Sequence, residues 1–115
     1  KNIQRENKHK FFGKSCDTLI YANGNAYKYK ANEDPSFDFA ASVLSTVEYV
    51  HNISFKKFVM ISTISVYNDT SSKNTTKESS KIDKEKLDNY GYHKLLAERY
   101  VQHYCKNYLI FRLSG

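Results

Sequence analysis

This 115-residue sequence has few of the residues that lock or break a chain: four glycines, one proline, two cysteines and no tryptophan. Cys16 and Cys105 have no metal-ligand spacing and form no CxxC motif, so we expect free thiols and no metal site. No apolar run approaches the roughly 20 residues that a membrane-spanning helix needs. The polar run 1–10 shows no signal-peptide pattern. We therefore expect a soluble, cytoplasmic protein with no membrane partner.

The scarcity of glycine also bears on nucleotide binding. The glycines are Gly13, Gly24, Gly91 and Gly115, and none of them forms a GxGxxG or GxxGxxG pattern. In nucleotide-binding α/β folds such a turn follows the first strand and holds the dinucleotide phosphates. The sequence therefore lacks a recognisable pyrophosphate site.

The formal net charge of +6 is the one feature of composition that suggests a nucleic-acid partner. The lysines, however, are spread through the ends of the chain and one polar loop rather than gathered on one element. We expect a solvated basic surface that also attracts an anionic nucleotide, and no nucleic acid.

Three short apolar runs bounded by turn residues predict strands at 18–22, 57–63 and 108–113. Nearly continuous apolar runs of this kind are typical of strands buried on both faces of a parallel sheet. Helical patterns separate the three runs, which gives a βαβαβ order. This order favours a parallel sheet with right-handed crossovers.

The first predicted helix begins at Pro35, with Asp34 as its N-cap, and ends at about residue 52. Apolar residues recur in it at helical intervals and predict its buried face: Phe37, Ala40, Ala41, Val43, Leu44, Val47 and Val50. A second helix is predicted to run to about residue 106. The polar segments 25–34 and 68–83 are predicted to be loops.

Tyr90 and Lys94 stand four residues apart in the second helix, so their side chains share one face, one turn apart. A lysine ammonium favours the phenolate and can lower the tyrosine pKa toward neutral pH. A hydroxyl at the end of the adjacent strand would orient the oxygen that gains or loses the proton. The same spacing also arises by chance in a chain with 10 tyrosines and 18 basic residues. The alternative is a packing tyrosine beside a solvent-facing lysine.

Four segments, taken in order, resemble the extended short-chain dehydrogenase/reductase family, the NAD-dependent epimerases and dehydratases. They are a strand ending in Asn23-Gly24, the sequence ISTISVY at 61–67, the Tyr90-to-Lys94 helix, and the strand that follows it. The resemblance, from about residue 17 to the end, implies an α/β fold: part of a Rossmann-like, three-layer, doubly wound parallel sheet. It further implies that residues 1–115 form the middle to second half of an NAD(P)-binding domain, without the C-terminal substrate portion.

The family motif also implies roles for individual residues. Tyr90 would be the general acid/base, Lys94 would lower its pKa and bind the nicotinamide ribose, and Thr63 would hydrogen-bond the reacting oxygen. Small side chains after the first strand would let the backbone approach the cofactor, either NAD or NADP. Tyr90 and Lys94 are also implied to contact the cofactor. The other implied cofactor contacts are Ala22, Asn23, Gly24, Ser42, Ile61, Ser62 and Leu113.

Departures from the family pattern narrow the expected function. Ile64 and Ser65 stand where 4,6-dehydratases have an Asp-Glu pair that serves in the elimination of water, and neither can do that work. The resemblance therefore implies a sugar-nucleotide epimerase or ketoreductase with a nucleotide-sugar-like substrate, and it allows for a homodimer. His93 stands where the family often has Ser. Asn68 stands where Gly usually follows the Val-Tyr pair, which is Val66-Tyr67 here. These two departures leave open a non-catalytic nucleotide-binding or interaction scaffold.

Overall fold

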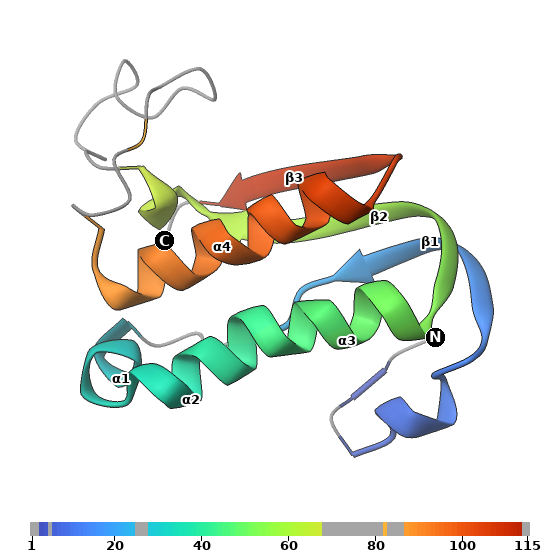
Figure 1. Cartoon of the computed structure of the whole chain (residues 1–115), viewed down its shortest axis with the longest axis horizontal. Coiled ribbons are helices and arrows are strands. Elements are labelled where there is room, and N and C mark those ends of the chain that lie inside the picture. The colour runs from blue at the N-terminus through green and yellow to red at the C-terminus, as the bar shows by residue number, and fades with distance from the viewer. Residues whose placement is uncertain (1–2, 5, 25–27, 68–81, 83–86, 114–115) are drawn as a thin grey trace.

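The chain is described by a computed structural model that covers residues 3–4, 6–24, 28–67, 82 and 87–113. Within these residues three strands form one sheet in the order β1-β2-β3, and both neighbouring pairs are parallel. The strands are β1 (Ser15–Tyr21), β2 (Ser54–Thr63) and β3 (Tyr108–Leu113). Figure 1 shows α3 and α4 side by side on one face of this sheet. The predicted parallel α/β arrangement is confirmed.

The strand register brings all three carboxyl ends to one edge of the sheet. Tyr21 pairs with Met60, and Thr63 pairs with Leu113. We call this edge, formed by residues 21–24, 63–67 and 113, the carboxyl edge. It is the place where parallel α/β sheets bind their ligands.

β1 and β2 both begin three residues earlier than their apolar runs. The polar starts of the two strands pair with each other, Ser15 with Ser54 and Cys16 with Phe55. Backbone hydrogen bonds therefore extend the sheet where hydrophobicity gives no signal. The expectation that 18–22 is buried on both faces is wrong for the described part of the chain. Along β1 only Leu19 and Tyr21 are buried, and Ile20 is 66% exposed.

The segment between β1 and β2 contains one helix that the sequence pattern did not predict. Residues 25–34 were expected to form a loop, but α1 (Lys28–Glu33) occupies most of them. This helix has less than two turns and buries only Ala31, so it has no apolar stripe from which a period could be recognised.

The predicted helix from Pro35 to residue 52 is present as three consecutive segments. These are α2 (Pro35–Phe39), the π-helix η2 (Ala40–Leu44) and α3 (Ser45–Asn52). Asp34 caps the start, because its side chain accepts a hydrogen bond from the Phe37 N–H at 3.2 Å. The predicted N-cap, the proline at the start of the helix and the end of the helix are confirmed.

The predicted buried face of this helix is largely wrong. Of the predicted apolar residues Val43 is buried, whereas Phe37, Ala40 and Leu44 are exposed. The helix instead buries a mostly polar stripe, which consists of Asp38, Ser42, Ser45, Thr46 and Tyr49. A π-turn contains extra residues, so it changes the face that a given position occupies. The Thr46 hydroxyl also donates to the Ser42 carbonyl oxygen at 2.7 Å, which satisfies one buried polar group locally.

The second long helix, α4 (Asn89–Tyr104), ends close to the predicted place. Its N-cap is Asp88, whose side chain accepts a hydrogen bond from the Gly91 N–H at 2.8 Å. Two 3-10 turns complete the described elements: η1 (Lys8–Lys10) and η3 (Ile64–Val66).

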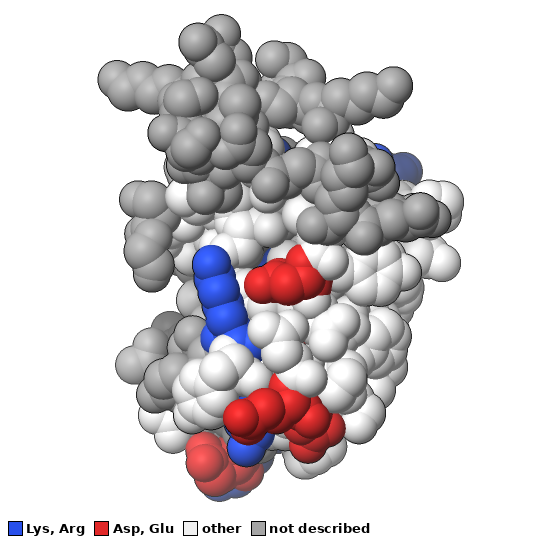
Figure 2. Space-filling view, turned by 90° about the vertical axis from the view of Figure 1, so that its left-hand side faces the viewer, with Lys and Arg blue, Asp and Glu red and all other residues white. Residues whose placement is uncertain are grey.

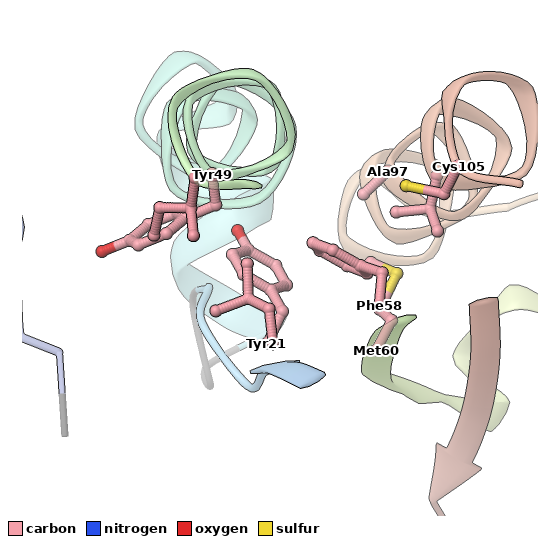
Figure 3. Packing of buried hydrophobic residues seen from close by; sticks show 9 residues of the cluster. Tyr21, Tyr49, Phe58, Met60, Ala97 and Cys105 are labelled. Carbon is pink, nitrogen blue, oxygen red and sulfur yellow. The ribbon is translucent and has the colours of Figure 1, made fainter. Parts of the chain in front are cut away.

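The main core lies between the sheet and the two long helical segments. In Figure 3, Tyr21 of β1 points toward Tyr49 of α3, and their ring centroids lie 5.6 Å apart. Phe58 and Met60 of β2 lie near Ala97 of α4, and all three residues are almost completely buried. This packing fixes both helices against the sheet and thereby positions the start of α4 at the carboxyl edge.

The structure also bears on the cysteines, on membrane spanning, on the distribution of charge and on the predicted loop 68–83. Both cysteines are free, as predicted, with Cys16 exposed and Cys105 buried. No helix among the described residues is long and apolar enough to cross a bilayer. Figure 2 shows the side toward which the strands end, where described basic and acidic side chains are interspersed rather than gathered by sign. The predicted loop 68–83, except for Ile82, lies outside the described residues, as does Asn68.

Candidate functional site

Lys94 brings two of the predicted site segments together at the carboxyl edge. Its side chain is buried, and its Nζ donates a long hydrogen bond of 3.5 Å to the Asn23 carbonyl oxygen. The same Nζ lies 5.7 Å from the centroid of the Tyr90 ring, within reach of a cation–π interaction. The tyrosine and lysine of α4 therefore share one face, and that face meets the turn after β1.

Gly24 leaves the space that the lysine occupies. A Cβ at this position would lie 2.5 Å from Lys94 Nζ and 3.5 Å from Ser42 Oγ, and the backbone φ is +132°. The φ value strains any other residue here, and a Cβ would also displace the movable end of the lysine side chain. The predicted residues Asn23, Gly24, Ser42 and Lys94 are thus brought together.

Ser42 is placed by the π-helix, a feature often found at functional sites. Its side chain is almost fully buried, and its hydroxyl has no hydrogen-bond partner among the described residues. A buried polar group without a partner is costly, so an unpaired hydroxyl beside a lysine ammonium is suited to bind a polar ligand atom.

Thr63 and Tyr90 come to the same edge through a close contact between the turn after β2 and the start of α4. Thr63 ends β2, and its Oγ1 accepts a hydrogen bond from the Ser65 N–H at 3.1 Å, which leaves its own hydrogen free to donate elsewhere. The Ser65 carbonyl oxygen lies against Gly91, so close that a Cβ there would clash with it. Glycine at this position lets the helix that carries Tyr90 approach the turn.

The pKa of Tyr90 is raised rather than lowered. Burial of the phenol is the main cause, and the nearby Asp38 and Asp88 carboxylates add to it. The pKa of Lys94 is lowered by burial, against the opposing effect of Asp38 and Glu98. The net shift of the Tyr90 pKa is thus opposite in direction to the one expected from the lysine, and the effect of Lys94 itself stays a prediction. The spacing of Tyr90 and Lys94 reveals neither their burial nor the carboxylate that α2 supplies.

The sequence pattern missed a buried pair next to this site. His93 Nδ1 lies 2.6 Å from Asp38 Oδ2, and both residues are buried between α2 and α4. In the sequence His93 is marked only by its departure from the family pattern, and Asp38 by its place inside a predicted helix. That place is the available signal, since a buried Asp is almost always paired.

Ser62 is committed to the interior rather than to the carboxyl edge. Its hydroxyl donates to Glu98 Oε2 at 2.5 Å, and Arg112 donates to Glu98 Oε1 at 2.6 Å. The Arg112 guanidinium also lies 4.9 Å from the centroid of the Tyr67 ring. The network joins β2, β3, α4 and the turn after β2. The Ser62 hydroxyl is therefore engaged within this network, and its contact with a cofactor stays a prediction.

The remaining predicted cofactor residues lie at the ends of strands. Ala22 directly follows β1 and is exposed. Ile61 is half-buried near the end of β2, and Leu113 ends β3 with 56% of its surface exposed. Their contact with a cofactor stays a prediction.

Comparison with known proteins identifies the family. Residues 3–114 match the model described as "NAD dependent epimerase/dehydratase family". The chain belongs to the NAD-dependent epimerase/dehydratase family. A comparison with curated protein sequences found no significant match.

Two solved structures share the fold of this family member. One is described as RMD from Pseudomonas aeruginosa complexed with NADPH, with a TM-score of 0.70 and 21% identity over 86% of this chain and 36% of that chain. The other is Pal from Bacillus thuringiensis, with a TM-score of 0.68 and 18% identity over 84% of this chain and 32% of that chain. The chain spans about a third of the length of these structures. At such identities the likeness shows a Rossmann-like fold and nothing finer.

The described residues fit a nicotinamide dinucleotide. Ser42 offers a buried hydroxyl without a partner among the described residues, and Gly24, which has no side chain, lets the Lys94 ammonium lie beside it. These groups match the hydroxyls of a ribose, which need donors and acceptors at short range. The residues that would hold the pyrophosphate are not recognisable in this sequence.

Proposed function

We propose that this chain carries the catalytic edge of an NAD(P)-dependent sugar-nucleotide epimerase or ketoreductase. The observation that carries the proposal is the convergence of Tyr90, Lys94, Gly24 and Ser42, which come from three separate segments. Family membership supports the same reading. The nucleotide-sugar substrate, a homodimer and a cytoplasmic location rest on the family resemblance and on composition.

Lys94, Gly24 and Ser42 would bind and orient the cofactor. The ammonium has three hydrogens, of which one is directed at the Asn23 carbonyl oxygen, so others can be donated to ribose hydroxyls. Ser42 Oγ can donate or accept beside it. When bound, the nicotinamide accepts or supplies the hydride.

Tyr90 would hold and move the proton of the reacting hydroxyl. In the reducing direction the phenol donates its proton to the carbonyl oxygen of the substrate, and in the oxidising direction the phenolate takes it back. Burial and two carboxylates raise the pKa of Tyr90, so the phenol is protonated at neutral pH, as an unperturbed tyrosine is. The cost of forming the phenolate at this site is therefore greater than in water. Thr63 would donate its free hydrogen to the same substrate oxygen.

Cofactor binding and turnover by the complete native protein test this proposal. NADH and NADPH fluorescence titration should give saturable binding, and a panel of nucleotide sugars should change the 340 nm absorbance. Lys94→Met should weaken cofactor binding by roughly tenfold or more, the effect of losing a hydrogen bond to a charged group. Lys106→Met, at an exposed site beyond the far end of α4, should leave the affinity unchanged.

Two results would count against the proposal in different ways. Absence of binding by the wild-type protein would exclude the cofactor. Binding without turnover on a broad panel of substrates would favour the non-catalytic scaffold.

A further inference from the structure

The buried pair of Asp38 and His93 directly joins the two helical segments that supply the cofactor site. Asp38 lies in α2 and is completely buried, and His93 lies in α4 and is 7% exposed. Their 2.6 Å contact is a charge-assisted hydrogen bond in which the carboxylate accepts from Nδ1. The His93 ring also packs edge-on against Phe39, with centroids 5.4 Å apart.

Each member of this pair is a near neighbour of a proposed cofactor residue. His93 immediately precedes Lys94 in α4. Asp38 precedes Ser42 by four residues, so the two lie on one side of the helical run, and both belong to its buried stripe. A shift of one helix along the other would therefore move Lys94 relative to Ser42.

Among the described residues, the hydrogen bonds of Lys94 and Ser42 themselves do little to fix the ammonium against the hydroxyl. The hydrogen bond from Lys94 Nζ to the Asn23 carbonyl oxygen is long, at 3.5 Å, and Ser42 Oγ has no partner among the described residues. Ser42 also lies in a π-helix, where the regular hydrogen-bond ladder of the α-helix is altered. The short Asp38–His93 bond is a direct polar link between the two helices close to both residues.

We propose that Asp38 and His93 are positioning residues, which hold the Lys94 ammonium against Ser42 and Gly24 and so set the geometry of the cofactor ribose site. The proposal rests on the proposed function, because it assumes that Lys94 and Ser42 bind the cofactor. The charge of Asp38 raises the pKa values of both Tyr90 and Lys94, which shows that the pair lies close to both residues.

A set of His93 variants in the complete native protein tests the proposal. His93→Ala removes the hydrogen bond, whereas His93→Asn keeps an N–H donor close to the position of Nδ1. We expect His93→Ala to weaken NADH or NADPH binding roughly tenfold, since small misplacements of binding groups have effects of this size or larger. His93→Asn should recover the affinity to within about threefold of wild type.

His93→Ala also leaves a buried carboxylate without its histidine, which threatens folding. The double variant Asp38→Asn/His93→Ala removes that charge and serves as the second test, with the same expected loss of affinity. The matched control is His51→Gln. His51 also joins the first helical run to α4, through a 2.5 Å contact between Nε2 and the Tyr100 hydroxyl, but lies on the exposed far part of both helices. This variant should bind the cofactor as the wild type does.

The possible results distinguish failure of this proposal from failure of the proposed function. If folded His93→Ala, or the double variant, shows a lower melting temperature but binds the cofactor with wild-type affinity, the pair is merely structural. That result would overturn the proposal. An equal loss of affinity in His93→Asn and in the His51 control would overturn it as well. Absence of binding by the wild-type protein would overturn the proposed function itself, and this inference with it.

Discussion

Among individual residues, the site depends on burial as much as on motif. The shared face of Tyr90 and Lys94 could be predicted, because a four-residue spacing in a helix fixes which side chains lie on one side, whereas Thr63 is indicated by the family motif alone. The Asp38–His93 pair could not be predicted, since the two residues are 55 positions apart in the sequence. The direction of the Tyr90 pKa shift could not be predicted either. It depends on the loss of solvent around the phenol and on carboxylates from two other places.

The Asp88 carboxylate gives the clearest test of this electrostatic account. Negative charge near a phenol disfavours the phenolate, so Asp88 helps to raise the pKa of Tyr90. Asp88→Asn removes the charge but keeps a good N-cap for α4. We expect the Tyr90 pKa to fall, the proton-accepting form to appear at lower pH, and stability to change by less than about 0.5 kcal/mol.

The measurement is a pH titration of protein labelled with carbon-13 at tyrosine Cζ. Asp17→Asn is the control, because Asp17 is exposed near the start of β1 and pairs with Lys56. It should leave the Tyr90 titration in place. A Tyr90 resonance that titrates at the same or higher pH in Asp88→Asn would contradict the account.

Among the helices and strands, some boundaries could be predicted from local chemistry, whereas the buried face of the first long helix could not. Asp34-Pro35 marks a helix start with local chemistry, and β3 is bounded as its apolar run predicts. The helix that follows Pro35, however, buries Asp38 and Ser42 and exposes Phe37 and Leu44. A regular 3.6-residue period places the wrong side inward, because the π-turn changes the phase and α4 supplies a polar partner.

Gly91 sets how closely α4 approaches the turn after β2. A glycine-to-alanine change inside a helix ordinarily stabilises by about 1 kcal/mol. At Gly91 the added methyl group would meet the Ser65 backbone carbonyl, which cannot rotate away. We expect Gly91→Ala to destabilise the protein by about 1–3 kcal/mol, as overpacking does, and to weaken catalysis by moving Tyr90.

Urea unfolding and turnover measurements check this prediction, with Gly13→Ala as the control. Gly13 has a φ of +87° and open space around it, so alanine there strains the backbone by about 1–2 kcal/mol without touching the site. It should lower stability and leave the kinetics of the folded protein unchanged. A Gly91→Ala protein more stable than the wild type would refute the contact.

For the whole molecule, the sheet is covered on one face and open on the other among the described residues. Ile20, Leu109, Phe111 and Leu113 are exposed large apolar side chains of the strands. The register aligns Ile20 and Leu109 on either side of Val59, so these side chains form one continuous surface. β1 is also an edge strand in the described sheet, with backbone groups available for pairing. The parallel order could be predicted from the alternation of strands and helices, but the side chains that form the open face could not, because an apolar run looks the same whether or not it is covered.

This surface predicts how residues 1–115 behave when expressed alone. An exposed apolar sheet face and an open strand edge favour association, so we expect oligomers or aggregates at micromolar concentration and no measurable NAD binding. The double variant Leu109→Lys/Phe111→Lys should reduce association, whereas Gln102→Lys, on the exposed side of α4, should not. Size-exclusion chromatography with light scattering distinguishes these cases. A monomer with a sharp melt that NAD shifts upward would contradict the prediction.

The central claim is that Tyr90 moves a proton in an NAD(P)-dependent reaction, and the kinetics of Tyr90→Phe in the complete protein test it most directly. Tyr92→Phe is the control, since Tyr92 lies two residues away in the same helix and is also partly buried. Tyr90→Phe should keep cofactor affinity within about threefold, because it removes one hydroxyl from the site, and lower kcat by roughly 10²- to 10⁴-fold, the range for loss of a general acid/base. Tyr92→Phe should retain both values. Wild-type turnover in Tyr90→Phe would show that the chemistry is done elsewhere and would contradict the account.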